Sequence, residues 1–195
     1  MAEDRRPEIL DATCRVIAKV GLHGMYIRHV ADEAGVSRAL VSYYFPTRDD
    51  LLAAALEHAE LRAINEIGSR TRAGSARERI TETLLLEFDD SPAVRDNWVI
   101  WSELTEAALF DGSFRGPMKA WSERWNEAIA RMIEDGQRGG SIATTVRAAD
   151  AAERLTGLVD GLGSRWLLGE VSQERARELV REAVALELGR SASTN

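Results

Sequence analysis

The sequence contains one cysteine and four prolines in 195 residues. The single cysteine, Cys14, excludes an internal disulfide, and its place in an apolar helical pattern predicts a buried thiol in a reducing compartment. No apolar run is long enough to span a bilayer, and the opening MAEDRRPEIL contains no apolar signal region. We therefore expect a cytoplasmic protein with no membrane partner.

Motifs that carry enzyme chemistry are also missing. The three histidines, His23, His29 and His58, lack metal-ligand spacing, and there is no nucleophile elbow, phosphate loop or dinucleotide fingerprint. The acidic pairs Asp49-Asp50 and Asp89-Asp90 fall where helices are expected to begin or end. We expect no catalytic residue, no metal, no cofactor and no enzyme activity.

A surplus of positive charge is also missing: 25 lysines and arginines stand against 32 acidic residues, and the formal net charge of −7 argues against a protein that coats nucleic acid non-specifically. The stretch 21–48 is an exception, because it holds three arginines against two acidic residues, with two histidines besides. The acidic surplus therefore lies elsewhere. This asymmetry indicates two regions with different functions, which we place at residues 1–47 and 48–195.

Apolar residues recur at helical spacing along the whole chain, and no strand pattern is visible. Capping boxes at Thr47–Asp50 and Ser75–Glu78 predict the first residues of two helices. The predicted fold class is all-α, with a three-helix helix-turn-helix domain followed by a larger helical bundle, about nine helices in all. The expected helices span, approximately, residues 7–20, 27–34, 37–45, 47–67, 75–89, 91–109, 117–136, 146–168 and 172–188.

The spacing of Ala31, Gly35 and Val41 is that of a DNA-binding helix-turn-helix. Gly35 suits a left-handed turn, and Ser37 suits the N-cap of the second helix. An ordinary helical hairpin would show the same spacing, so the exposed face of the second helix decides between the two interpretations. That face is predicted to carry groups that reach base edges and phosphates rather than the Glu and Lys of a solvated surface: Arg38, Ala39, Ser42 and Tyr43.

Residues 9–62 resemble the N-terminal domain of the TetR family of bacterial transcriptional repressors. The resemblance rests on the first apolar run and Gly21, on VADEAGVS and VSYYF, and on a Pro-Thr-Arg turn before DDLL. The form VSYYF is similar to the branch that contains the choline-responsive repressor BetI. The C-terminal part resembles the same branch through its tryptophan pairs and the segment 158–162, although Gly163 replaces an expected bulky residue.

The resemblance implies contacts with double-stranded operator DNA. The residues expected to face the major groove are Ser37, Arg38, Ala39 and Tyr43. The residues expected to contact the DNA backbone are Arg28, His29, Ser42, Tyr44 and Arg48. Tyr26, Ala39 and Arg48 depart from the family's usual Thr, Gly and Lys, so the operator sequence does not follow from the resemblance.

Four of the five tryptophans form helical pairs on consecutive helices. They could be core residues, or they could line an aromatic pocket for a small-molecule effector between helices. Together with nearby carboxylates such a pocket would suit a cationic amine, at about 0.5–2 kcal/mol per cation–π contact. The candidate effector-binding residues are Trp98, Trp101, Glu103, Glu106, Trp121 and Trp125.

The last two predicted helices carry long apolar stripes, and Gly157-x-x-x-Gly161 suggests a close helix–helix approach. The stripes could pack within the chain or form a self-complementary four-helix interface in a homodimer. The resemblance and the need for two recognition helices both favour the homodimer. The candidate interface residues are Leu155, Leu158, Val159, Leu162, Leu179, Val180, Ala183 and Val184.

Together these patterns predict a ligand-responsive transcriptional regulator, in the simplest form a repressor that a small-molecule effector releases from its operator. The alternative is a helical ligand-binding or interaction module, or an enzyme, without specific DNA binding; a gel-shift assay on DNA flanking the gene separates the two. The sequence leaves open the effector, the operator, the regulated genes, an activator role, and one or two dimers per operator.

Overall fold

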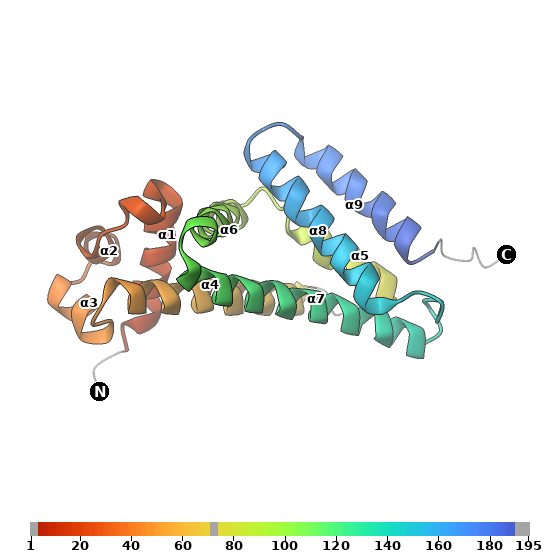
Figure 1. Cartoon of the computed structure of the whole chain (residues 1–195), viewed down its shortest axis with the longest axis horizontal. Coiled ribbons are helices and arrows are strands. Elements are labelled where there is room, and N and C mark those ends of the chain that lie inside the picture. The colour runs from red at the N-terminus through yellow and green to blue at the C-terminus, as the bar shows by residue number, and fades with distance from the viewer. Residues whose placement is uncertain (1–3, 71–73, 190–195) are drawn as a thin grey trace. The chain divides into compact units, whose positions relative to one another are not determined.

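The computed structural model describes residues 4–70 and 74–189, and this part of the chain forms nine α-helices and one short 3₁₀ helix, with no strand (Figure 1). The predicted all-α fold is confirmed. The helices are α1 (Arg6–Gly24), α2 (Ile27–Ala34), α3 (Arg38–Tyr44), α4 (Arg48–Arg70), α5 (Ala76–Leu86), α6 (Pro92–Phe110), α7 (Arg115–Arg138), α8 (Ala148–Leu167) and α9 (Gln173–Glu187), with the 3₁₀ helix η1 at Gly112–Phe114. No helix in the described ranges is long and apolar enough to cross a membrane.

The chain divides into two compact units. Unit 1 comprises residues 1–66 and 95–114, and unit 2 comprises residues 67–94 and 115–195. The sequence predicted a division at residue 47, but most of α4 and nearly all of α6 pack in the same unit as α1–α3. The physical reason is that α4 and α6 each contribute buried apolar residues to this unit, among them Leu51, Leu52 and Leu104.

Unit 1 contains the predicted helix-turn-helix. Val30 and Ala31 of α2 and Val41 of α3 are buried in a common core with α1. Gly35 adopts a left-handed conformation with φ 66°, as predicted for the turn, and its N–H donates to the Asp32 carbonyl. The small buried Ala31 therefore suits the contact between α2 and α3, and Gly35 supplies the left-handed turn that joins them.

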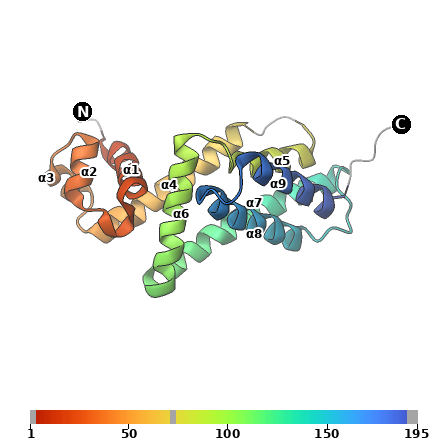
Figure 2. The ribbon, with the colours of Figure 1, turned by 90° about the horizontal axis from the view of Figure 1, so that it is seen from above.

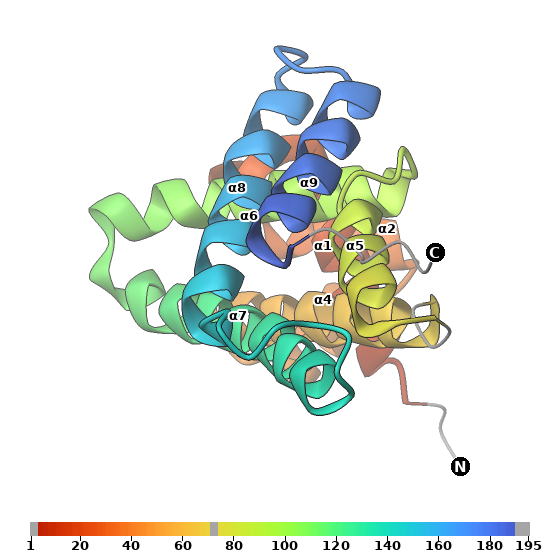
Figure 3. The same cartoon turned by 90° about the vertical axis from the view of Figure 1, so that its right-hand side faces the viewer.

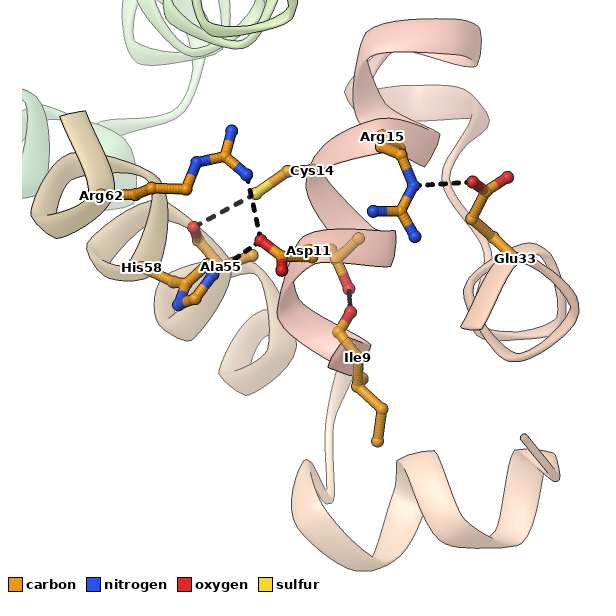
Figure 4. Close-up of polar contacts among 9 residues, drawn as sticks. Ile9, Asp11, Cys14, Arg15, Glu33, Ala55, His58 and Arg62 are labelled. Carbon is orange, nitrogen blue, oxygen red and sulfur yellow. Dashed lines mark hydrogen bonds and ion pairs between the residues drawn. The ribbon is translucent and has the colours of Figure 1, made fainter. Parts of the chain in front are cut away.

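Polar contacts fasten α1 to its neighbours, as Figure 4 shows. Asp11 accepts hydrogen bonds from His58 and Arg62 of α4, at 2.8 and 3.1 Å. The Cys14 thiol, which is buried as predicted, donates to the carbonyl of Ala55 in α4 at 3.5 Å. Burial raises the pKa of this thiol to about 11, so the thiol remains protonated and structural rather than reactive.

The end of α1 differs from the prediction. Helical structure was expected to stop at Gly21, and the backbone does leave the helix there, with φ 73° and ψ 169°. A further short helical turn follows, however, and carries the element to Gly24. The positive φ explains the glycine, because a residue with a Cβ is strained in this region.

Unit 2 is a bundle of α5, α7, α8 and α9, in which α5 and α8 each contact both α7 and α9 (Figure 3). Figure 2 shows the same four helices gathered side by side. The capping box at Ser75 and Glu78 is present as predicted. At Gly136 a Cβ would lie 2.8 Å from the Ala76 Cβ, so this glycine permits the close crossing of α5 and α7.

Candidate functional site

The outward face of α3 is built on two buried anchors. Val41 and Phe45 are fully buried, and they fix the orientation of the short helix. The opposite side then carries the four residues that the sequence predicted for the outward face of this helix, all of them exposed: Arg38, Ala39, Ser42 and Tyr43. Tyr43 is 79% exposed, which is unusual for so large an aromatic side chain on a well-anchored helix. This face combines a cation, a small residue and two hydroxyls, the groups that contact base edges and phosphates.

Two neighbouring residues serve the local structure as well. The Ser37 hydroxyl caps α3 by accepting the Leu40 N–H at 3.1 Å. Tyr44 is half-buried, and its hydroxyl accepts the N–H of Arg5 at 3.4 Å. Both side chains lie beside the exposed face of α3, but their oxygens already have partners in the chain.

Arg28 and His29 lie together on α2. The Arg28 guanidinium lies 4.6 Å from the centre of the Tyr26 ring, and its Nε donates to His29 Nε2 at 3.2 Å. His29 Nδ1 lies 3.2 Å from the Gly24 carbonyl. Tyr26 occupies the N-cap without a capping hydrogen bond, in keeping with its replacement of the usual Thr. The aromatic ring therefore orients an exposed arginine at the start of α2.

One acidic charge on α2 is compensated by ion pairs. Glu33 of α2 accepts hydrogen bonds from Arg15 and Lys19 of α1 at 2.8 and 2.7 Å, and these bonds lower its pKa. Figure 4 shows the Arg15–Glu33 pair between α1 and α2. A carboxylate that would otherwise repel phosphates is thus compensated by two cations.

The guanidinium of Arg48 is partly engaged within the chain. Its Nη2 donates to the Leu22 carbonyl at 2.5 Å, and its Nε donates to the Met25 carbonyl at 3.3 Å. The arginine, the first residue of α4, therefore binds the turn between α1 and α2. The sequence assigned it to phosphate from its position alone and could not indicate which carbonyls would approach it.

The candidate effector residues divide between the two units. Trp98 is buried and Trp101 half-buried in unit 1, whereas Trp121 and Trp125 are half-buried on α7 in unit 2. Trp98 contributes mainly to the core of unit 1, the alternative that the sequence left open.

The two candidate carboxylates of α6 differ. Glu106 is exposed to solvent. Glu103 is half-buried, and its Oε2 accepts the N–H of Leu22 at 2.7 Å. The prediction that Glu103 belongs to an effector site therefore needs correction, because its carboxylate is engaged with the backbone of the α1–α2 turn.

Sequence reasoning gave no role to Asp160 of α8. Its side chain is largely removed from water, and its carboxylate makes no hydrogen bond or ion pair with any residue of the described ranges. Burial raises its pKa to about 6. A desolvated carboxylate without a partner is a common mark of a binding site. The only available signal was its position in the LVDGL segment of the family resemblance.

Most of the candidate interface residues are core residues of unit 2. Five of the eight are buried within the single chain and offer little surface to a partner: Leu155, Val159, Leu162, Val180 and Val184. Assigning these five to an interface was wrong, because the apolar stripe they form packs inside the bundle. Leu158, Leu179 and Ala183 are half-buried.

The two glycines of α8 do not mediate close packing within the chain. A Cβ built at Gly157 or Gly161 meets nothing within 4 Å. Both glycines are exposed, and so is Leu168, the residue that directly follows the last residue of α8. The face of α8 that carries the glycines, rather than the apolar stripe, is where a second chain could approach.

Comparisons with known proteins agree with this geometry. Residues 9–55 match the family model for bacterial regulatory proteins of the tetR family, and residues 76–189 match the model for the C-terminal region of BetI-type transcriptional repressors. The HTH-type transcriptional regulator BetI of Burkholderia cenocepacia is 30% identical over 195 residues, and the alignment covers 95% of each chain. The BetI of Burkholderia mallei is 29% identical over 177 residues, or 89% of this chain and 86% of that protein.

Solved structures give the same result. A TetR-family regulator from Rhodococcus sp. is 36% identical with a TM-score of 0.88, and the match covers 95% of this chain and 98% of that one. A regulator from Saccharomonospora viridis, solved in complex with choline, is 29% identical with a TM-score of 0.79, and the match covers 91% and 93% of the two chains. The helix-turn-helix of unit 1, the helical bundle of unit 2 and these matches together establish that this chain belongs to the TetR family of bacterial transcriptional regulators, with a C-terminal region of the BetI type.

Proposed function

We propose that this chain is a dimeric repressor that binds its operator through the outward face of α3 and dissociates when a cationic amine binds unit 2. The observation that carries the DNA-binding part is the exposed set Arg38, Ala39, Ser42 and Tyr43 on a helix whose other side is anchored by buried residues. We propose a binding function without a catalytic step, in the cytoplasm, where a transcriptional regulator meets DNA.

In this proposal two copies of α3 enter successive major grooves, about 34–36 Å apart or a multiple of that distance. Arg38 and Tyr43 contact base edges, and Ser42 contacts phosphate. Arg28, oriented by the Tyr26 ring, contacts the DNA backbone from α2. Bound across a promoter, such a dimer blocks transcription.

For the dimer we propose the open face of α8 and the adjoining part of α9. This surface carries Gly157, Gly161 and the half-buried Leu158, with Leu179 and Ala183 on α9. Residues without bulky side chains let helix backbones of two chains approach closely, and the half-buried apolar groups supply area to bury.

For the effector we propose that Asp160 supplies the counter-charge and that Trp121 and Trp125 supply the aromatic wall. Thr156 of α8 donates to the Asn126 side chain of α7 at 2.5 Å, and this bond fixes the two helices side by side. Asp160 follows Thr156 by one helical turn on the same side of α8. The two helices of a hairpin run in opposite directions. The step from Thr156 to Asp160 along α8 therefore matches the step from Asn126 toward Trp125 and Trp121 along α7.

A cationic amine suits these groups because it neutralises a desolvated carboxylate and is attracted to the faces of indole rings. The related regulator from Saccharomonospora viridis was solved with choline, a quaternary amine. Shifting the population from mostly competent to mostly incompetent for DNA requires the effector to prefer the second state by roughly 5 kcal/mol.

The proposal is tested by a gel-shift assay with DNA flanking the gene, in the absence and presence of choline. The expected result is a specific shifted band that choline abolishes. Failure to shift any flanking fragment contradicts the DNA-binding part, and a band insensitive to choline and to a panel of related amines contradicts the effector part.

A further inference from the structure

The turn between α1 and α2 is held by two charged side chains that bind the same residue from opposite sides. Glu103 of α6 accepts the N–H of Leu22 at 2.7 Å, and Arg48 of α4 donates to the carbonyl of Leu22 at 2.5 Å. Leu22 itself is buried. Both contacts are charge-assisted hydrogen bonds, which are roughly twice as strong as neutral ones.

The backbone at Gly21 is shaped around the Glu103 carboxylate. A Cβ at Gly21 would lie 3.0 Å from Oε2 and 3.2 Å from Oε1 of Glu103. Gly21 also has a backbone φ of 73°, which residues other than glycine rarely adopt. The kink at Gly21 in α1 and the position of the Glu103 carboxylate therefore depend on each other.

The turn determines where the helix-turn-helix begins. The turn, residues 21–26, leads directly into α2. Arg48, which also bonds to this turn, is the first residue of α4 and lies four positions after the last residue of α3. The Met25 carbonyl also accepts from Arg48, at 3.3 Å, so one arginine bonds both ends of the turn. A displacement of α6 would therefore move Leu22 through Glu103. Leu22 lies in the turn before α2 and bonds to Arg48 at the start of α4, so the segments before α2 and after α3 would both be affected.

We propose that Glu103 is a positioning residue for operator binding: it transmits the position of α6 to the helix-turn-helix by holding the N–H of Leu22. This inference rests on the proposed DNA-binding function. It assigns to α6 a route to the recognition helix that is separate from the contacts Asp11 makes with α4.

The test compares operator affinities of full-length variants, with an operator fragment selected from genomic DNA by the wild-type protein. Glu103→Leu keeps the approximate size but removes the acceptor, and Glu103→Gln keeps a carbonyl acceptor for the Leu22 N–H. The matched control is Glu57→Leu, at an exposed glutamate on α4 in the same unit. If the leucine variant does not fold, as judged by circular dichroism, Glu103→Ala replaces it.

The expected result is an operator affinity about tenfold lower for Glu103→Leu, within about threefold of wild type for Glu103→Gln, and unchanged for Glu57→Leu. Amide exchange at Leu22 should be faster in the leucine variant only. Wild-type affinity in Glu103→Leu overturns the inference, and so does equal loss in the leucine and glutamine variants or a loss that follows the unfolded fraction. If the wild-type protein itself selects no DNA, the proposed function fails first.

Discussion

The recognition helix α3 and the α1–α2 turn lie in the same unit, but the charged side chains at these two places differ in whether they bond within the protein. On α3, Arg38 is exposed and makes no hydrogen bond or ion pair with residues of the described ranges. Around the turn, Arg48 and Glu103 are half-buried, and each binds the backbone of Leu22. Charged residues near a DNA-binding surface therefore belong to two classes, those that remain available for DNA and those that fix the geometry of the protein.

The difference cannot be seen from charge or position in the sequence alone. Arg38 is the first residue of α3, and Arg48 follows ten positions later, just after that helix. Arg48 uses two of its five donors to bond to carbonyls of its own chain, whereas the side chain of Arg38 is exposed to solvent. The following experiments test this contrast, beginning with the largest expected effect.

Loss of the free groups on α3 should have the largest effect. We expect Arg38→Ala and Tyr43→Ala each to lower specific operator affinity about 10- to 100-fold, because each removes a base contact. The exposed Arg131→Ala on α7 is the matched control and should change affinity less than twofold. Fluorescence anisotropy gives the affinities, and sedimentation checks that the dimer is intact. Wild-type affinity in both α3 variants would refute the assignment of this face to DNA.

In unit 2, Asp160→Asn should lower the affinity for choline about tenfold, because the counter-charge is lost. Since the pKa of Asp160 is raised to about 6, wild-type affinity should fall as pH drops below about 6, and the affinity of the variant should not change with pH. Calorimetry at pH 5 and pH 7.5 measures both. Glu153→Gln, exposed on the same helix, is the control. Equal affinities for wild type and Asp160→Asn would exclude this carboxylate from the site.

Arg48 and Arg28 should differ in salt dependence. Arg48→Met should weaken operator binding several-fold by loosening the turn, with the slope of log K against log[salt] unchanged. Arg28→Ala should reduce the slope by about 0.9, because it removes one phosphate contact. Titrations at several salt concentrations distinguish the two. A reduced slope for Arg48→Met would show that Arg48 contacts phosphate, and the two arginines would then not differ in role.

The smallest effect on DNA binding is expected at Cys14. Its buried thiol touches only the α1–α4 contact, so Cys14→Ala should change operator affinity less than twofold. The thiol ionises near 9.0 when unfolded and near 11 when folded, so stability is unaffected below pH 9 and falls as pH rises from 9 to 11. Denaturant unfolding of wild type should show this fall, and Cys14→Ala should show less of it. Rapid alkylation of native Cys14 at pH 8 would contradict its burial.

The local features of the fold were predictable because short-range chemistry specifies them. Gly35 supplies the left-handed turn, Ser37 and Ser75 cap the following helices, and Pro92 begins α6, all as expected from single positions and their neighbours. The exposed face of α3 followed from the same helical periodicity. Helix ends shifted by a few residues, as at Arg138 and Ala148, because packing decides the last turn.

Features that depend on distant parts of the chain were not predictable. Glu103 meets Leu22 across 81 positions, so no local pattern could show that its carboxylate was engaged. Likewise, the apolar stripe containing Leu155 and Val180 has the same periodicity whether it faces the chain's own core or a partner. The sequence also could not predict that the Asp160 carboxylate would have no hydrogen-bond or ion-pair partner in the described ranges, because only the packed helices show which polar groups are left without one.

The central claim is that Arg38 and Tyr43 contact base edges, and specificity tests it more directly than affinity. The measurement is the affinity of wild type and Arg38→Ala for the operator and for a set of single base-pair substitutions across each half-site. We expect wild type to lose affinity at a particular base pair and Arg38→Ala to become indifferent at that pair alone. If Arg38→Ala instead weakens binding to every sequence equally and keeps the wild-type preferences, the residue contacts phosphate and the claim is contradicted.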